Sequence, residues 1–158
     1  MNILVLCTGN SARSILLESL LNRLGEGRVT AYSAGSQPAG AVHPQSIDLL
    51  KGEGIDTLAL RSKSWDEFAA PDAPVMDAVI TVCGSAASET CPIWPGAPVR
   101  AHWGVEDPAA APDSEAAEAF RTAWEILQRR TVAFLAEPVE DMAPEALQPH
   151  LIRCGEVQ

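Results

Sequence analysis

The feature that most constrains the fold is the N-terminal segment, where a short apolar run meets a loop of small and polar residues. Residues 2–6 are almost entirely apolar, which is typical of a strand buried on both faces of a sheet. From Ile15 to Leu24 the leucines recur at helical spacing, and Gly25 ends the pattern. The loop 7–14 joins the two segments. Strand, tight loop and helix in this order predict a βα unit of a parallel sheet.

The rest of the chain continues this alternation of strand and helix patterns. We expect three further strands, at residues 28–33, 75–82 and 98–103. Further helices are expected at residues 44–51, 65–68 and 114–135, the last capped by Ser114. The alternation predicts an α/β fold with a mainly parallel sheet. The proline-rich segment beyond Glu137 is expected to form an appended arm.

The composition fits one domain and argues against nucleic acid or membrane as partners. A chain of 158 residues is long enough for a single hydrophobic core. Lys and Arg number 11 against 21 Asp and Glu, so the formal net charge is −10. Such a field repels phosphate backbones and anionic lipid surfaces. No apolar run approaches the roughly 20 residues that span a bilayer, and residues 1–6 lack the basic start of a signal peptide.

The cysteines indicate both a compartment and a kind of chemistry. Cys7, Cys83, Cys91 and Cys154 are too few for a disulfide-dense secreted scaffold. In a reducing cytoplasm, cysteines more often serve catalysis, redox cycling or metal binding than structural bridges. We therefore expect a cytoplasmic protein, in which Cys154 of the tail is a bystander.

The loop after the first strand has the residues of an oxyanion site. Because it opens a helix at the carboxyl end of a strand, its backbone N–H groups converge where the helix dipole is positive. The same field lowers the pKa of a cysteine, which makes Cys7 a candidate nucleophile. Arg13, six residues later, can clamp two oxygens of the anion. The alternative is a buried cysteine that ends a strand. The predicted oxyanion-binding loop is Thr8, Gly9, Asn10, Ser11, Ala12, Arg13 and Ser14.

Individual loop residues have distinct expected roles. Gly9 allows close backbone approach, Ser14 can donate to a thiolate, and Asn10 can lock the loop internally. Glu18 is expected to project from the first helix toward Asn10 and Ser33, where it holds the loop or a cation. A solvated helical glutamate is the alternative.

An acid is expected in the segment that follows the last strand. Asp107 precedes Pro108 in a loop at the same end of the sheet, where its carboxyl group could protonate a departing oxygen. By itself, Asp-Pro is also a common turn signal. Glu106 is the competing candidate for the acid.

Cys83 and Cys91 form a second candidate site. Cys83 follows a parallel strand and so emerges at the same sheet edge as Cys7. If the residues between Cys83 and Cys91 are helical, the two thiols lie about 10 to 12 Å apart, so a disulfide requires the segment to unwind. Because residues 84–88 are small and bury little surface, unwinding this segment costs little free energy. The alternatives are two structural thiols or a zinc site, although no C-x2-C or H-x3-H spacing supplies the remaining zinc ligands.

Taken together, these residues resemble the arsenate reductases built on the low-molecular-weight protein tyrosine phosphatase fold. The resemblance covers residues 1–137, taken as the phosphatase-like domain, with residues 138–158 as a C-terminal tail. It implies a three-layer α/β sandwich in which helices flank a four-stranded parallel sheet. The segments that carry it are residues 7–14, 32–36, 81–96 and 102–108.

The resemblance also implies a three-cysteine relay that reduces arsenate to arsenite in arsenic detoxification. Cys7 attacks arsenate held by the loop and Arg13, and Asp107 protonates the leaving hydroxide. Cys83 releases arsenite and forms a disulfide with Cys7, and Cys91 then moves the disulfide to Cys83–Cys91. Thioredoxin or a glutathione/glutaredoxin system supplies the reducing equivalents, and no cofactor is bound.

The sequence departs from the family pattern in ways that affect these expectations. Ala12 stands where many phosphatase relatives carry a second cysteine, and Gly84 and Ser85 replace a more polar pair. The region 62–65 lacks an obvious acidic ligand for the potassium ion that some members bind, so no metal is predicted.

Two other functions compete with arsenate reduction. A low-molecular-weight phosphotyrosine phosphatase would share Cys7, Arg13 and the acid, but alanines follow Asp107-Pro108 where such enzymes usually present aromatic residues. A non-enzymatic oxyanion- or arsenite-binding regulator would use the thiols as ligands and would not need Asp107.

Overall fold

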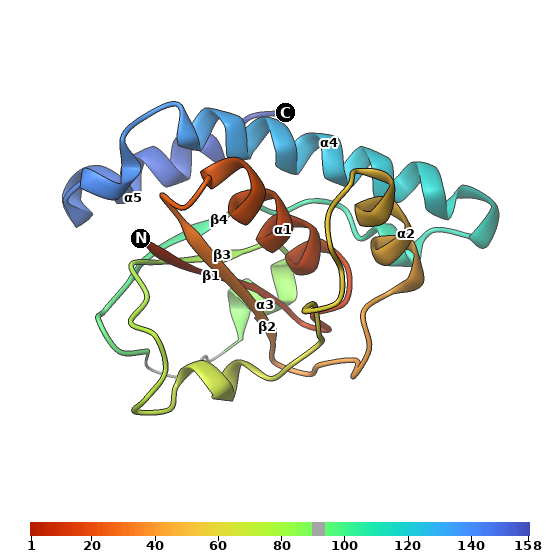
Figure 1. The fold of residues 1–158 in the computed structure, drawn as a ribbon, viewed down its shortest axis with the longest axis horizontal. Coiled ribbons are helices and arrows are strands. Elements are labelled where there is room, and N and C mark those ends of the chain that lie inside the picture. Colours follow the sequence, from red (N-terminus) through yellow and green to blue (C-terminus); the bar gives the residue numbers. More distant parts are fainter. Residues whose placement is uncertain (90–93) are drawn as a thin grey trace.

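A twisted, all-parallel sheet forms the centre of the protein (Figure 1). The computed structural model describes residues 1–89 and 94–158. The strand order is β2-β1-β3-β4, so β1, the first strand in the sequence, lies inside the sheet and pairs with both β2 and β3. The four-stranded parallel sheet flanked by helices is confirmed. The strands are β1 (Asn2–Cys7), β2 (Thr30–Gly35), β3 (Ala78–Thr81) and β4 (Val99–His102).

The helices follow the expected order, but the long helix begins later than expected and the tail contains an additional helix. The expectation that Ser114 caps the long helix was wrong, because Asp113–Glu115 form a separate 3-10 turn and α4 begins at Ala116. A helix that the sequence patterns did not predict, α5, follows in the tail. The helices are α1 (Arg13–Gly25), α2 (Pro44–Gly52), α3 (Gly84–Ser88), α4 (Ala116–Leu135) and α5 (Pro144–Cys154). Further 3-10 turns are η1 (Trp65–Phe68), η2 (Pro108–Ala110) and η4 (Val139–Asp141).

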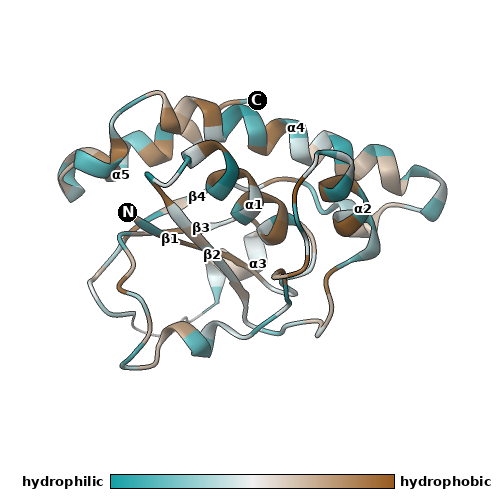
Figure 2. Cartoon of the chain, viewed as in Figure 1, coloured by the Kyte–Doolittle hydropathy of each residue, from teal (hydrophilic) through white to brown (hydrophobic). Residues whose placement is uncertain are grey.

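The side chains of β1 alternate between two cores. Ile3 and Val5 belong to the larger core, which the buried sides of α1, α4 and α5 cover. Leu4 and Leu6 point to the opposite face and pack with a smaller cluster that includes Trp65 of η1. Figure 2 shows hydrophobic and hydrophilic residues alternating along α4, as expected for a helix with one face on a core. Burial on both faces explains why the first strand is apolar at nearly every position.

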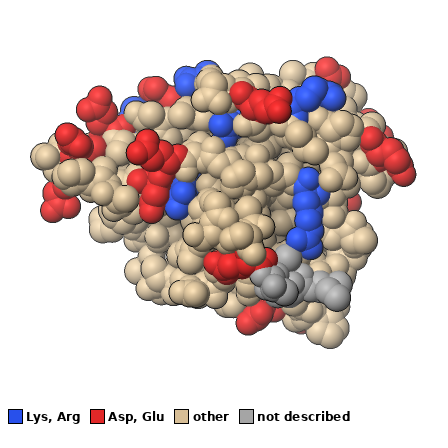
Figure 3. All heavy atoms as spheres, turned by 180° about the vertical axis from the view of Figure 1, so that it is seen from behind, with Lys and Arg blue, Asp and Glu red and all other residues tan. Residues whose placement is uncertain are grey.

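Acidic side chains are spread over the surface rather than gathered in one patch on the face that Figure 3 displays. In the part of the chain that the structure describes, no helix is long and apolar enough to cross a membrane.

The C-terminal tail is packed onto the domain and is not a loose arm. Leu147, Leu151 and Cys154 of α5 are buried in the larger core, and the indole Nε1 of Trp103 donates to the Leu151 carbonyl at 2.8 Å.

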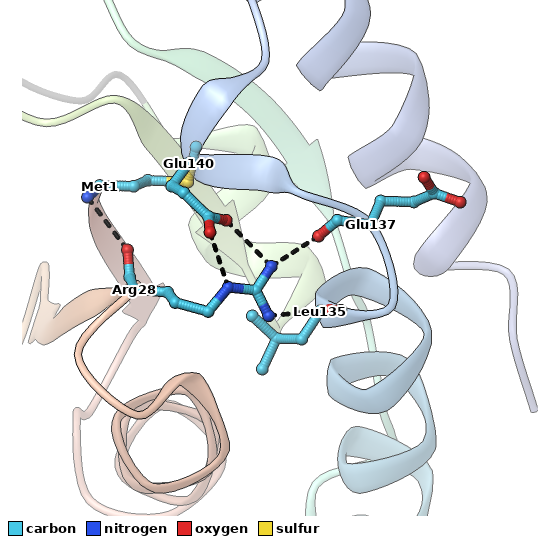
Figure 4. A network of polar contacts seen from close by, with 5 residues as sticks. All are labelled: Met1, Arg28, Leu135, Glu137 and Glu140. Carbon is cyan, nitrogen blue, oxygen red and sulfur yellow. Dashed lines mark hydrogen bonds and ion pairs between the residues drawn. The ribbon is translucent and has the colours of Figure 1, made fainter.

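Arg28 anchors the start of the tail (Figure 4). Its guanidinium binds both carboxylate oxygens of Glu140 at 2.9 Å and donates to the carbonyls of Leu135 and Glu137. The N-terminal ammonium of Met1 donates to the Arg28 carbonyl. The N-terminus and the start of the C-terminal tail therefore meet at one arginine.

Candidate active site

The predicted oxyanion loop occupies the turn between β1 and α1. β1 ends at Cys7 and α1 begins at Arg13. Asn10 takes a left-handed backbone conformation with φ of 47° and is completely buried. Left-handed backbone is tolerated by asparagine better than by most residues.

Three carbonyl groups of the loop point outward and accept hydrogen bonds from the segment that follows β2. The carbonyls of Thr8, Gly9 and Ser11 accept hydrogen bonds from the amides of Gln37, Ala39 and His43 at 2.9–3.0 Å. In a planar peptide unit, the N–H points away from the carbonyl. The amides that follow these carbonyls therefore face the inside of the loop, where an oxyanion can accept their protons. The Gly9 amide also forms a hydrogen bond that lowers the pKa of Cys7.

Gly35 lets β2 pass directly beside the loop. A Cβ atom at this position would lie 2.4 Å from the Thr8 carbonyl oxygen and 3.1 Å from the Asn10 nitrogen. Any side chain here would therefore displace the loop backbone. The Gly35 amide is bonded to the carbonyl of Lys63, which holds the neighbouring segment in place.

Arg13 and Asp107 face each other across the opening of the loop. Arg13 Nη2 lies 3.5 Å from Asp107 Oδ2, and Nη1 donates to the Val105 carbonyl at 3.0 Å. The Nε of Arg13 is buried and has no hydrogen-bond partner among the described residues. A buried donor without a partner is costly, and an oxyanion over the loop would satisfy it.

Asp107 is placed to exchange protons with solvent and site. Its side chain is 44% exposed, and its Oδ1 accepts the Ala109 amide at 3.0 Å, which fixes the carboxylate at the start of η2. Glu106, the competing candidate, is exposed, and among the described residues it forms no ion pair with Arg13. The geometry favours Asp107 as the acid.

Cys7 and Cys83 lie side by side, as their positions at the ends of neighbouring strands β1 and β3 predict. The two thiols share a hydrogen bond, so they titrate together. Accepting this bond lowers the pKa of Cys83 to about 5, although burial opposes the shift. The same bond, together with burial, raises the pKa of Cys7, so the expectation of a lowered pKa was wrong for the protein without an oxyanion, although Arg13 and the Gly9 amide act in the expected direction. Of the two thiols, Cys83 is therefore the one that ionises first.

Two further donors stabilise the Cys83 thiolate. Cys83 is the N-cap of the short helix α3, and its Sγ accepts the Ala86 amide at 3.4 Å. The Thr8 hydroxyl lies 3.5 Å from the same sulfur, so one loop residue contacts the second cysteine. No sequence pattern indicated this role for Thr8, because it depends on the pairing of β1 with β3.

The remaining cysteines separate into two cases. Cys91 lies outside the described residues. Cys154 is buried in α5, where its sulfur is 3.8 Å from His150 Nε2, and it belongs to the packing of the tail. Among the described residues, no group of three or more His, Cys, Asp or Glu side chains could hold a metal ion.

A groove of about 490 Å³ runs from Asp107 along α4. Its lining includes Ala110, Ala111 and Pro112 and several acidic side chains, and no aromatic ring lines it among the described residues. The rim beside the acid is therefore small-chained and negatively charged.

The comparisons with known proteins agree with this geometry. The family model described as low molecular weight phosphotyrosine protein phosphatase matches residues 2–144. The chain belongs to this family. The match spans the loop, Cys83 and Asp107, and it extends past residue 137 into the start of α5.

The similar relatives carry a more specific name. An arsenate reductase of Halalkalibacterium halodurans is 36% identical over 131 residues, which cover 82% of this chain and 91% of the relative. One from Bacillus subtilis is 36% identical over 124 residues, 78% of this chain and 82% of the relative. A solved arsenate reductase in the phosphate binding state superposes with a TM-score of 0.69 at 29% identity, covering 85% of this chain and 96% of that one.

Proposed function

We propose that this member of the family reduces arsenate to arsenite. The observation that carries the proposal is the placement of Cys83 beside the Cys7 loop, where its sulfur lies 3.5 Å from the Thr8 hydroxyl and each of the two thiols shifts the pKa of the other. Phosphate-ester hydrolysis needs one cysteine in this position, whereas reduction of arsenic by a protein needs two thiols that can join. Relatives with the name arsenate reductase support the same choice of substrate.

In the first step, arsenate binds to the inward-facing amides and to Arg13, whose buried Nε gains a partner. The Cys7 sulfur attacks arsenic as a thiolate and one As–OH oxygen leaves. Asp107 supplies the proton that turns this oxygen into water, since it lies 3.5 Å from Arg13 at the edge of the loop. The product is a covalent Cys7–arsenic adduct.

In the second step, the Cys83 thiolate attacks the Cys7 sulfur. The S–As bond breaks, its electron pair stays with arsenic, and As(V) becomes As(III), which leaves as arsenite. The two cysteines are oxidised to a disulfide. In the adduct Cys7 no longer donates to Cys83, and the Thr8 hydroxyl and the Ala86 amide remain as the donors that lower the pKa of Cys83 and favour its thiolate.

The third step transfers the disulfide to a position from which a partner can reduce it. Cys91 attacks Cys83, Cys7 leaves as a thiolate, and a Cys83–Cys91 disulfide results. Thioredoxin, or glutaredoxin with glutathione, then reduces the disulfide through its own thiols. This cycle requires the reducing cytoplasm expected from the cysteine content.

Single-turnover experiments test the order of the thiols. Mixed with arsenate and no reductant, the prereduced wild-type protein and Cys91→Ser are each expected to release one arsenite per protein, whereas Cys83→Ser releases none. In the Cys91→Ser product, mass spectrometry is expected to find a Cys7–Cys83 disulfide. Normal cycling of Cys91→Ser with thioredoxin would contradict the three-thiol scheme.

The same assays distinguish the competing functions. A phosphatase would hydrolyse aryl phosphates briskly and release no arsenite, and the described residues that line the groove beside Asp107 include no ring to stack on a tyrosine. An arsenite-binding regulator would bind arsenite without turning over arsenate, and Asp107→Asn would not change that binding.

A further inference from the structure

The segment that carries Asp107 has no regular secondary structure of its own. It leaves β4 after His102 and reaches the acid at the start of η2. The amides of Trp103 and Val105 donate to carbonyls at and just after the end of β3, at 2.7 and 3.3 Å. Because no helix or strand fixes residues 103–107, the position of the acid depends on the individual contacts of this short segment.

Two arginines from different helices hold consecutive carbonyl groups of the segment. Arg13 of α1 donates from Nη1 to the Val105 carbonyl at 3.0 Å. Arg130 of α4 donates from Nη1 to the Gly104 carbonyl at 3.1 Å. Arg13 belongs to the oxyanion site, whereas none of the three proposed steps uses Arg130. The acid segment is therefore held once from within the site and once from a helix outside it.

Arg130 also binds the C-terminal tail, which packs beside α4 and β4 (Figure 1). Its Nε donates to the Val157 carbonyl at 2.8 Å, so one planar guanidinium joins the tail to the acid segment. The indole of Trp103, at the start of the same segment, donates to the Leu151 carbonyl of α5 at 2.8 Å. A Cβ atom on Gly155 would lie 2.6 Å from Trp103 Cδ1, so the tail lies directly against this side chain.

The surroundings of Arg130 are unusual for a cation. The residue is only 4% exposed, and burial lowers the pKa of its guanidinium. Among the described residues, Arg130 forms no ion pair within 4.0 Å. A buried cation costs stability, and an apolar side chain of similar volume often serves stability as well or better. Stability alone therefore does not explain a guanidinium here, whereas the fixed directions of its donors do.

We propose that Arg130 is a positioning residue, which joins the C-terminal tail to the Gly104 carbonyl and thereby holds Asp107 at the opening of the oxyanion loop. It acts through the backbone of residues 104–107 and does not touch the oxyanion. Leu151 and Val157, which complete the link, lie beyond residue 144, where the family match ends. The inference rests on the proposed function in one respect, because it takes Asp107 as the acid of the first step.

The test separates the rate of the reaction from the binding of the anion. Prereduced protein is mixed with saturating arsenate, and the rate constant and the amplitude of arsenite release are measured in a single turnover. Arg130→Met is expected to lower the rate constant about 10- to 10²-fold, as for a group displaced by about 1 Å. The amplitude and the inhibition by inorganic phosphate are expected to stay the same, because the loop amides and Arg13 hold the anion. A protein that is only destabilised would lose amplitude instead.

Arg129→Met is the matched control. The Nε of Arg129 donates to the Gln158 carbonyl at 2.7 Å on the surface, so this variant also removes a contact between α4 and the tail but none to the acid segment. It is expected to keep the parent rate constant. Hydrogen exchange followed by mass spectrometry adds a readout that needs no substrate. Peptides that cover residues 103–107 are expected to exchange faster in Arg130→Met and at the parent rate in Arg129→Met.

Two further variants isolate the path through the acid. Added to Asp107→Asn, Arg130→Met is expected to lower the rate constant by less than about twofold, because the group that it positions can no longer give a proton. Arg130→Lys keeps the cation but lacks the planar fork that reaches two carbonyls. It is therefore expected to lower the rate constant in the same direction as Arg130→Met.

The outcomes decide the inference in either direction. An unchanged rate constant in Arg130→Met would overturn it, as would full additivity with Asp107→Asn. If Arg130→Met does not fold, Arg130→Lys decides by the same readouts. If the wild-type protein releases no arsenite, the proposed function fails, and the variants are compared by hydrolysis of an aryl phosphate, whose leaving oxygen also needs an acid. Hydrogen exchange shows with any substrate whether Arg130 holds the segment, and unchanged exchange in Arg130→Met would overturn the inference by itself.

Discussion

At the scale of single residues, the decisive feature is the coupling between the Cys7 and Cys83 thiols. Their hydrogen bond lowers the pKa of Cys83 and raises that of Cys7, which favours ionisation of Cys83 before Cys7. In the proposed first step Cys7 attacks arsenic as a thiolate, so we expect oxyanion binding and loss of the Cys7 proton to be linked.

The dependence of the Cys83 pKa on Cys7 can be measured by thiolate absorbance near 240 nm. With a pKa of about 5, Cys83 is ionised above this pH and protonated below it. Cys7→Ala removes the donor that contributes most to the lowering, so the Cys83 titration is expected to move upward, toward the ordinary thiol range. An unchanged titration curve in Cys7→Ala would show that the Thr8 and Ala86 contacts alone set the pKa.

The assignment of the acid predicts different effects for two adjacent carboxylates. Asp107→Asn keeps the shape of the side chain but cannot protonate the leaving oxygen, so kcat for arsenate is expected to fall about 10²- to 10⁴-fold. Glu106→Gln is the matched control and is expected to keep nearly full activity. The reverse pattern in steady-state kinetics would assign the acid to Glu106.

At the scale of elements, the site depends on how closely β2 approaches the β1–α1 loop. Gly35→Ala places a methyl group 2.4 Å from the Thr8 carbonyl oxygen. We expect a loss of about 1–3 kcal/mol in unfolding free energy, as for other overpacking changes, together with weaker phosphate binding. Denaturant unfolding and phosphate titration measure the two effects.

Gly52 supplies the control for this substitution. It lies in α2 with nothing within 4 Å of an added Cβ, so Gly52→Ala is expected to leave phosphate binding unchanged. Equal effects of the two substitutions would mean that the close approach of Gly35 has no special role.

The same elements show what sequence reasoning can reach. The periodicity of residues 2–24 located β1, the loop and α1, because burial on both faces and helical spacing leave direct traces in the sequence. Placing Cys7, Cys83 and Asp107 at one edge followed from parallel strands alone. The contact of Thr8 with Cys83 and the bond from Arg13 to the Val105 carbonyl could not be predicted, since they join residues far apart in the chain.

Two errors in the predicted elements have physical causes. Serine is a common N-cap residue, which suggested Ser114, but the 3-10 turn at Asp113–Glu115 moves the start of α4 to Ala116. The prolines of the tail suggested an arm, yet Pro144 occupies the first turn of α5, where its missing N–H is harmless, and Pro149 is exposed.

At the scale of the whole molecule, α5 is part of the core and its removal is expected to be costly. Leu151 is completely buried in the larger core. Leu151→Ala is expected to lower the unfolding free energy by about 2–5 kcal/mol, since it leaves a cavity. Ile152, the next residue, is 46% exposed, and Ile152→Ala is expected to cost within about 0.5 kcal/mol. Similar small losses in both variants would mean that the tail contributes little to the fold.

The global charge and the local field of the site have opposite signs. A net charge of −10 repels oxyanions at long range, whereas the inward amides, the start of α1 and Arg13 attract them at the loop. Steering by the whole molecule therefore slows the arrival of arsenate, and added salt weakens this repulsion. The net negative charge is a property of the whole surface, whereas oxyanion binding depends on a few residues that create a local positive field.

The most direct test of arsenate reduction is arsenate-dependent NADPH oxidation by the purified protein. The assay is run once with thioredoxin and thioredoxin reductase, and once with glutaredoxin, glutathione and glutathione reductase. Wild-type protein is expected to oxidise one NADPH per arsenite formed with one of the two systems, and Cys7→Ser to oxidise none. Absence of arsenate-dependent oxidation with both systems, alongside rapid hydrolysis of an aryl phosphate, would contradict the account and assign the protein to the phosphatases.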